Sequence, residues 1–321
     1  MRRFGLLGLG LLAMAAALTL PLAWGGLPAL RSSLNFPQAG WGGVLLLAGV
    51  AALARATRQQ LLLNRLDAAP RASLNLAASL ATETAYALTP GSSGGLPASV
   101  WLLRRAGVPL SAALAVSAAD PLLDALFFAI ALPASALALT LEIDVRPLRE
   151  AAWLASTLLV VALVVAWLLR RALLRRVVAI AWRRPRWRRA WHDLRASLRD
   201  LLRGGVRLWL PQLLLAAVQW CARYGILAVI LHVLGHPLPF ALLLLVQGVA
   251  LHAAQWTGAP AGVGGAEIAL GLALGAWMPA ASAASAVLLW RIGTLLVPTL
   301  AGAAAFMVLG ARRAPILPEP G

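Results

Sequence analysis

The chain contains several apolar runs long enough to cross a lipid bilayer, and this feature limits its fold more than any other. Runs of roughly 18 or more apolar residues indicate membrane-spanning helices. Of the 321 residues, 61% are hydrophobic and only 12% are charged, whereas about 25% are charged in a typical soluble domain. A soluble enzyme, a secreted disulfide scaffold and a disordered chain are therefore excluded. The main runs are 4–24, 39–54, 72–89, 111–141, 151–169, 208–232, 240–256 and 280–309.

The basic residues are distributed unevenly between the predicted loops, and this orients the chain. All 28 are arginine, and 13 of them lie in the stretch 170–207. Because cytoplasmic loops are enriched in Arg and Lys, we expect the arginine-rich stretches to be cytoplasmic, together with both termini. The further stretches are marked by Arg55, Arg58, Arg65 and Arg71, by Arg104 and Arg105, and by Arg312 and Arg313. The loops 25–38, 142–150 and 233–239 hold only Arg31, Arg146 and Arg149.

The first run could be a secretory signal peptide, because Arg2 and Arg3 precede it. No clear cleavage site precedes Gly25, so we expect a retained helix. The excess of Arg, Ala, Leu, Gly and Pro, with no lysine, is typical of a GC-rich bacterial coding bias. The expected location is therefore the bacterial inner (plasma) membrane, which the chain would cross several times.

Two segments are expected to enter and leave the membrane on the same side. Residues 71 and 104 are both assigned to the cytoplasm, and the apolar stretches between them are short. We therefore expect 72–103 to form a re-entrant hairpin with its turn at 90–95, and 240–277 to form one from the outside with its turn at 259–265. Non-helical backbone inside a bilayer must face protein or a wet cavity. The predicted fold is an all-α polytopic membrane protein with about six full crossings and two re-entrant helical hairpins.

An internal repeat supports this arrangement. A single shift without gaps aligns three sets of residues: Pro90 with Pro260, Gly94-Gly95 with Gly264-Gly265, and Pro109 with Pro279. We expect a single integral membrane domain, 1–321, with a first inverted half at 1–141 and a second at 151–310. Inverted halves are a recurrent plan of transporters, which hold the substrate near the midplane. The alternative is that Gly and Pro merely permit close packing or kinks.

Charged residues inside the predicted spans are candidates for a binding site, because they are costly in hydrocarbon and normally face an interior cavity. The two turns also present helix N-termini, which favour anions, and a guanidinium suits phosphate. The predicted substrate-binding residues are Glu83, Pro90, Gly94, Gly95, Asp124, Pro260, Gly264, Gly265, Glu267 and Arg291.

Each charge also has a simpler interpretation. Glu267 and Arg291 could form a structural ion pair that fixes the second hairpin to the last helix. Asp120 could cap a kink at Pro121, and this interpretation is favoured over a functional one. For Arg223 we favour a packing role. Asn75, Gln247 and Gln255 are typical interhelical hydrogen-bonding residues.

The segment that follows residue 181 alternates indoles with guanidinium groups. Trp and Arg beside membrane helices are typical of a segment at the headgroup level that contacts anionic lipid. The predicted membrane-surface residues are Trp182, Arg183, Arg184, Trp187, Arg188 and Trp191. Binding of nucleic acid is disfavoured by the membrane context. No metal site, cofactor motif or catalytic constellation is recognised.

Three stretches resemble the lysylphosphatidylglycerol synthase transmembrane-region family, whose members are described as flippase-like. They are 89–94 (TPGSSG), 102–109 (LLRRAGVP) and 260–267 (PAGVGGAE), followed by Arg291, Pro298 and Gly302. The resemblance implies an integral membrane domain of the eight-helix type that exposes or handles lipids such as aminoacylated phosphatidylglycerol, isoprenoid lipids or hopanoids. Members often carry Glu where this chain has Gly95, and Arg where it has Pro121. No synthase domain is expected.

Two functions follow as hypotheses. The first is a flippase-like protein that translocates or handles a phosphate-bearing lipid, either an anionic phospholipid or a polyprenyl-type lipid, with coupling to protons through Glu83 or Glu267. The alternative is a non-transporting membrane subunit that presents lipid to a separate glycosyl- or aminoacyl-transferase. A transporter of ions or small solutes is disfavoured because few polar groups lie near the midplane.

Overall fold

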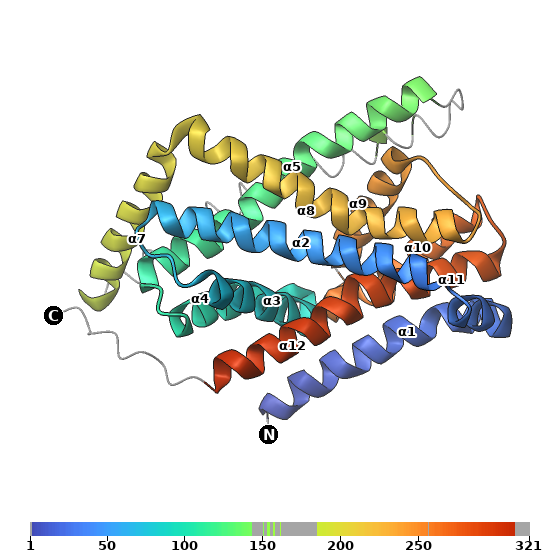
Figure 1. Cartoon of the computed structure of the whole chain (residues 1–321), viewed down its shortest axis with the longest axis horizontal. Coiled ribbons are helices and arrows are strands. Elements are labelled where there is room, and N and C mark those ends of the chain that lie inside the picture. Colours follow the sequence, from blue (N-terminus) through green and yellow to red (C-terminus); the bar gives the residue numbers. More distant parts are fainter. Residues whose placement is uncertain are drawn as a thin grey trace.

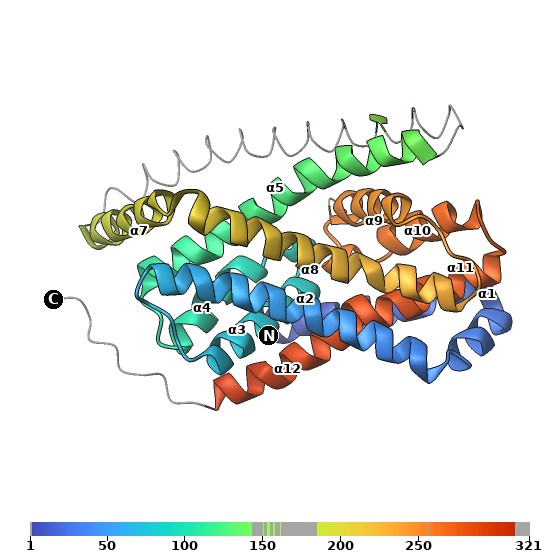
Figure 2. The same cartoon turned by 45° about the horizontal axis from the view of Figure 1, so that its top comes forward.

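The computed structural model describes residues 2–142, 150, 153, 154, 157, 161, 185–255 and 257–311. Within these ranges every regular element is a helix, and the long helices run roughly along the longest axis of the molecule (Figure 1). Figure 2 shows the same arrangement after a rotation of 45°. The predicted all-α polytopic fold is confirmed.

Five of the described helical segments are long and apolar enough to cross a bilayer. The last of them is interrupted by a π-helical segment, η3 (Ile292–Leu296), directly after Arg291. The predicted crossing at 151–169 lies almost entirely outside the described residues. The five are α1 (Arg2–Leu34), α2 (Gln38–Arg65), α5 (Leu110–Glu142), α8 (Gly205–Val233), and α11 (Ala280–Arg291) continued by α12 (Val297–Gly310).

The predicted hairpins are two pairs of shorter helices, each joined by a 3₁₀ turn. The first consists of α3 (Ala72–Leu88), η1 (Pro90–Ser92) and α4 (Gly95–Arg105). The second consists of α9 (Phe240–Gln255), η2 (Pro260–Gly262) and α10 (Gly265–Gly275). They occupy opposite halves of the long axis (Figure 1). Their tips meet, because the Gly91 amide donates a hydrogen bond to the Gly258 carbonyl at 3.1 Å.

The repeat found in the sequence reappears in the elements. The shift that aligns the two halves of the sequence also places the starts of η1, α4 and α5 on those of η2, α10 and α11, respectively. The two turns also share an unusual backbone. Gly91 and Ala261, which the same shift aligns, have φ of 56° and 51°, and Ser92 and Gly262 have φ of 59° and 64°. After this point the turns diverge, since Gly94 has φ of −78° whereas Gly264 has φ of 88°.

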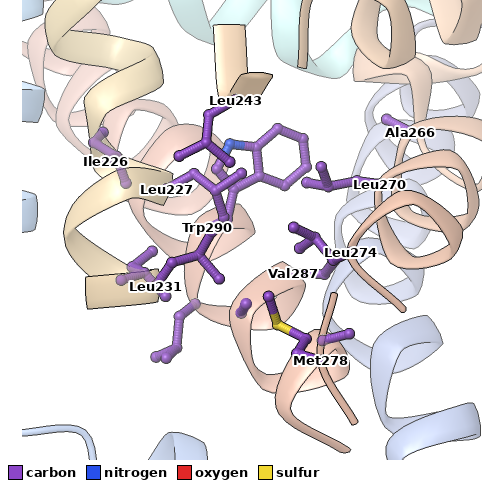
Figure 3. Close-up of a cluster of buried hydrophobic side chains, with 14 of the residues drawn as sticks. Ile226, Leu227, Leu231, Leu243, Ala266, Leu270, Leu274, Met278, Val287 and Trp290 are labelled. Carbon is purple, nitrogen blue, oxygen red and sulfur yellow. The ribbon is translucent and has the colours of Figure 1, made fainter. Parts of the chain in front are cut away.

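Each hairpin packs against the crossing formed by α11 and α12. In the second half of the molecule, buried Trp290 lies among Leu227, Leu243 and Leu270 (Figure 3). Its indole N–H donates to the Gln247 side chain at 2.9 Å. In the first half, α12 lies directly on α3. Gly302 makes this approach possible, because a Cβ at this position would collide with the carbonyl of Leu80 and the hydroxyl of Thr84.

The helix ends that carry arginine residues lie together at one end of the molecule. The C-terminal ends of α2 and α4 lie there together with α7 (Pro185–Arg203) (Figure 1). On α7, Leu201 is buried, and Leu194 and Leu198 pack against a core cluster that includes residues of α5. The apolar stripe of this helix therefore contacts protein, although Leu202 is 69% exposed.

Among the predicted membrane-surface residues, Trp191 is half-buried, and the Arg195 guanidinium lies 5.0 Å from its ring. Trp187 and Arg188 belong to α7, but their side chains lie outside the described part of the structure. Trp182, Arg183 and Arg184 also lie outside the described residues. Contact of this segment with lipid headgroups stays a prediction.

Candidate functional site

Three arginines and three carboxylates from four helices form one continuous network in the interior. They come from α2, α3, α5 and α8, and they alternate in charge along the network. The formal charges sum to zero, so the bundle contains a polar layer without a net charge. In order along the network, the residues are Arg223, Glu83, Arg55, Asp120, Arg58 and Asp124.

Glu83 is held between two helices. One carboxylate oxygen is paired with Arg55 of α2, and the other accepts from Arg223 Nη1 of α8 at 2.9 Å. Arg223 also donates through Nη2 to the carbonyl of Thr294 at 3.2 Å, inside the π-helical segment η3. Segments of this type are frequent at functional sites. The arrangement ties the first hairpin to α2, α8 and the last crossing.

The rest of the network connects α2 with α5. Asp120 Oδ2 accepts from Arg55 Nη2 at 2.9 Å, and its other oxygen is paired with Arg58. Arg58 is fully buried and donates to Asp124 Oδ1 at 2.8 Å. The indole N–H of Trp220 donates to the same oxygen at 3.0 Å. Asp124 therefore ends the network, and its side chain is 24% exposed.

Two cavities lie on either side of this network. The first has a volume of about 320 Å³ and is lined mostly by apolar side chains of α2, α3 and α12, so we call it the apolar cavity. The second, of about 350 Å³, is lined by most of the network and by the hairpin tips, so we call it the polar cavity. Their shared wall consists of Arg55, Glu83, Gln219, Arg223, Thr294 and Pro298.

The polar cavity contains buried hydrogen-bonding groups that have no partner among the described residues. Such groups are rare in folded proteins, and each one calls for a partner such as water or a ligand. Four of them line this cavity from α8, α11 and α12. They are Gln219 Oε1, Tyr224 Oη, Arg291 Nη2 and Thr299 Oγ1. The cavity therefore has capacity for a polar ligand that both accepts and donates hydrogen bonds.

Glu267 and Arg291 form a second, buried ion pair. Their Oε1 and Nε atoms are 2.6 Å apart, and their side chains are only 0% and 3% exposed. The other oxygen of Glu267 accepts from the backbone N–H of Gly264 at 2.7 Å, at the start of α10. The pair joins the tip of the second hairpin to α11, which is the arrangement of the ion-pair alternative.

The predicted site residues are therefore only partly brought together. Glu83, Asp124 and Arg291 line the polar cavity. From the two turns, Ser92 and Ala261 reach it instead of the predicted residues. The residues that do not belong to the walls of either cavity are Pro90, Gly94, Gly95, Pro260, Gly264, Gly265 and Glu267.

Three interpretations of charged residues are wrong. Arg55 and Arg58 do not belong to a loop after the second crossing, because α2 continues through both and buries them. Asp120 is not an N-cap, because α5 runs through Pro121 and the carboxylate binds two arginines. Arg223 is not a packing residue, since it pairs with Glu83.

One signal in the sequence could have found the network. Arg55 and Arg58 are three residues apart, and Asp120 and Asp124 are four apart, so each pair lies on one face of its helix.

The expected interhelical role of two polar residues is confirmed. Asn75 donates to the Ala56 carbonyl at 2.7 Å, and Gln247 donates to the Tyr224 carbonyl at 3.1 Å. Within the described residues, no group of three or more His, Cys, Asp or Glu side chains could hold a metal ion.

Comparison with known proteins identifies the family. The family model described as "Lysylphosphatidylglycerol synthase TM region" matches residues 5–302. No curated protein matches the chain. Because the match covers most of its length, the chain belongs to the lysylphosphatidylglycerol synthase transmembrane-region family, which relates it to membrane proteins that handle lipids.

Proposed function

We propose that the protein translocates a phosphate-bearing lipid across the bacterial inner membrane. The observation that carries this proposal is the pair of cavities with a shared charged wall. A lipid combines an apolar tail with a polar headgroup, and the two cavities offer one environment of each kind on the two sides of Arg55, Glu83 and Arg223. An ion or a sugar would leave the apolar cavity unused.

The arginines of the polar cavity favour a phosphate over other headgroups. Arg55, Arg223 and Arg291 all line it. A guanidinium binds phosphate oxygens through two parallel N–H donors, and this interaction is strengthened where water is scarce. The proposed ligand is therefore an anionic phospholipid or a polyprenyl-type lipid whose phosphate lies in the polar cavity.

The repeated elements support a transport function. We infer two inverted halves, because the hairpins enter from opposite ends, meet at their tips and begin at a constant offset in the sequence. In transporters of this plan, the substrate lies at the interface of the repeats and the two halves move relative to each other. The arginine-rich ends of α2 and α4, together with α7, are proposed to face the cytoplasm.

The experiment is a headgroup-exposure assay in proteoliposomes. Labelled lipids with anionic, zwitterionic, polyprenyl-phosphate and phosphate-free headgroups are incorporated, and a membrane-impermeant quencher reports the fraction reaching the outer leaflet. We expect movement of phosphate-bearing lipid only.

Two variants of α2 provide a matched comparison. Ala52→Phe fills the apolar cavity and is expected to abolish movement. Ala39→Phe adds the same ring at an exposed position of the helix and is expected to behave as wild type. No movement of any lipid by folded protein would contradict the proposal and favour a subunit that presents lipid to a separate transferase.

A further inference from the structure

Glu83 lies where two guanidiniums converge between the two cavities. Arg55 approaches one carboxylate oxygen from α2, and Arg223 approaches the other from α8. Two guanidinium groups from different helices around one anion also suit a phosphodiester, because its two non-bridging oxygens share one negative charge, as the two oxygens of a carboxylate do. In the structure, a side chain of the protein itself occupies this position.

The two arginines stay fixed without Glu83. Arg55 keeps two hydrogen bonds to Asp120 Oδ2, from Nη2 at 2.9 Å and from Nε at 3.2 Å. Arg223 keeps the Thr294 carbonyl at 3.2 Å, and its guanidinium lies 5.8 Å from the centre of the Trp220 ring. Departure of the Glu83 carboxylate would therefore leave a preformed anion site rather than two disordered side chains.

The site is accessible from both cavities. The side chains of Glu83, Arg55 and Arg223 are 18%, 11% and 26% exposed, and all three belong to the shared wall. Gln219 in the same wall is 3% exposed, and its Oε1 has no partner in the described structure. A buried polar atom without a partner, in the same wall as the two arginines, is a second indication that a ligand completes this position.

We propose that Glu83 occupies the phosphate site of the lipid at rest, and that a lipid phosphodiester displaces it from Arg55 and Arg223. The first segments of the acyl chains then lie in the apolar cavity, and the displaced carboxylate turns into the polar cavity. One negative charge replaces another at the two arginines, and the displaced carboxylate takes up a proton in the polar cavity, so the network stays neutral. This inference rests on the proposed function and names its headgroup site.

Binding measurements on the full chain, in nanodiscs of phosphate-free galactolipid, test the proposal. The probes are dihexanoyl phosphatidylglycerol, the soluble headgroup glycerophosphoglycerol, inorganic phosphate and dihexanoylglycerol, titrated by calorimetry. Glu83→Gln removes the competing charge, so it should bind the phosphatidylglycerol probe about tenfold more tightly than wild type, the equivalent of one charge-assisted hydrogen bond. Dihexanoylglycerol should bind weakly to both.

Two variants control for general electrostatics. Asp124→Asn removes another carboxylate of the polar cavity. This carboxylate accepts hydrogen bonds from Arg58 and Trp220 but from neither Arg55 nor Arg223. It should tighten binding much less than Glu83→Gln. The double variant Glu83→Gln/Arg223→Gln should lose the gain. Glu83→Asp keeps the charge but is too short to bridge both arginines. Glu83→Asp should bind the phosphatidylglycerol probe a few-fold more tightly than wild type. It replaces Glu83→Gln in the test if Glu83→Gln does not fold.

The outcomes separate this inference from the proposed function. If wild type binds the lipid probe and Glu83→Gln binds it with equal or lower affinity, the inference alone is overturned. An equal gain in affinity in Asp124→Asn also overturns the inference alone. No binding of any lipid by wild type or by the Glu83 variants overturns both proposals. Equal affinity for inorganic phosphate and for the lipid probe would assign the site to free phosphate and contradict the lipid as ligand.

Discussion

The two hairpins each carry one glutamate toward the middle of the molecule, and the two glutamates have opposite surroundings. Glu267 of the second hairpin is completely buried, and it binds Arg291 and the backbone of its own helix. Glu83 of the first hairpin is partly exposed in the wall between two cavities and pairs with arginines of two other helices. The same side chain thus serves assembly in one half and lies at the candidate site in the other.

The repeat explains why this difference is informative. The positions equivalent to Glu83 and Glu267 in the other half are Ala253 and Pro97, and the position equivalent to Arg291 is Pro121. The two halves share turn geometry and element starts, but they do not share charges. The backbone plan therefore follows the repeat, whereas five of the six network residues come from the first half and only Arg223 comes from the second, which makes the site asymmetric.

The largest expected effect comes from removing each carboxylate in turn. Glu267→Gln leaves Arg291 as a buried charge with no anionic partner, so we expect a loss of about 3–5 kcal/mol in the free energy of unfolding. In Glu83→Gln, Arg55 keeps Asp120 and Arg223 keeps Thr294, so the loss should be roughly 1–2 kcal/mol. Unfolding by SDS in mixed micelles measures both. Equal losses would contradict the contrast between a buried pair and an open network.

A second prediction concerns how the first hairpin docks on the last crossing. Gly302→Val places a side chain against the carbonyl of Leu80 and the hydroxyl of Thr84. Forcing α12 away from α3 should cost about 1–3 kcal/mol in the free energy of unfolding.

The matched control for this prediction is Gly310→Val, near the end of the same helix, where a Cβ would meet no atom within 4 Å. It should change the free energy of unfolding by about 0.5 kcal/mol or less. Similar values for the two variants would show that the close approach of α3 and α12 is not required.

The smallest expected effect compares the two turns directly. Gly91 and Ala261 occupy equivalent left-handed positions, which cost an L-residue about 1–2 kcal/mol but cost glycine little. Gly91→Ala should therefore destabilise the protein by about 1 kcal/mol, and Ala261→Gly should stabilise it by a similar or smaller amount. The added Cβ at Gly91 would make only ordinary contacts, so strain dominates. Thermal unfolding of the two variants measures this difference, and shifts of the same sign would contradict the shared turn geometry.

The sequence predicts the hairpins well because their signals are local. Pro90 and Pro260 begin the 3₁₀ turns as expected, and the helices that follow begin at Gly95 and Gly265. Proline restricts the backbone at these positions and glycine permits conformations that other residues avoid, and both effects are independent of the distant chain. For the same reason, the start of each long helix lies within a few residues of its apolar run.

The network could not be predicted in this way because its contacts are tertiary. Arg55 and Glu83 are 28 residues apart in the sequence, and Glu83 and Arg223 are 140 apart. A count of apolar residues places the end of the second crossing at residue 54, because Arg55 and Arg58 resemble the charges that flank a membrane span. Only the fold shows that α5 supplies Asp120 and Asp124 to compensate them.

The most direct test of the account is the rate of headgroup exposure for labelled phosphatidylglycerol in proteoliposomes of Arg223→Gln, compared with Arg207→Gln. Both residues belong to α8, but Arg223 lies in the shared cavity wall and Arg207 is exposed. We predict that wild type and Arg207→Gln expose lipid at the same rate. Folded Arg223→Gln should expose lipid no faster than protein-free vesicles do. Equal rates in Arg223→Gln and wild type would contradict the assignment of lipid handling to this network.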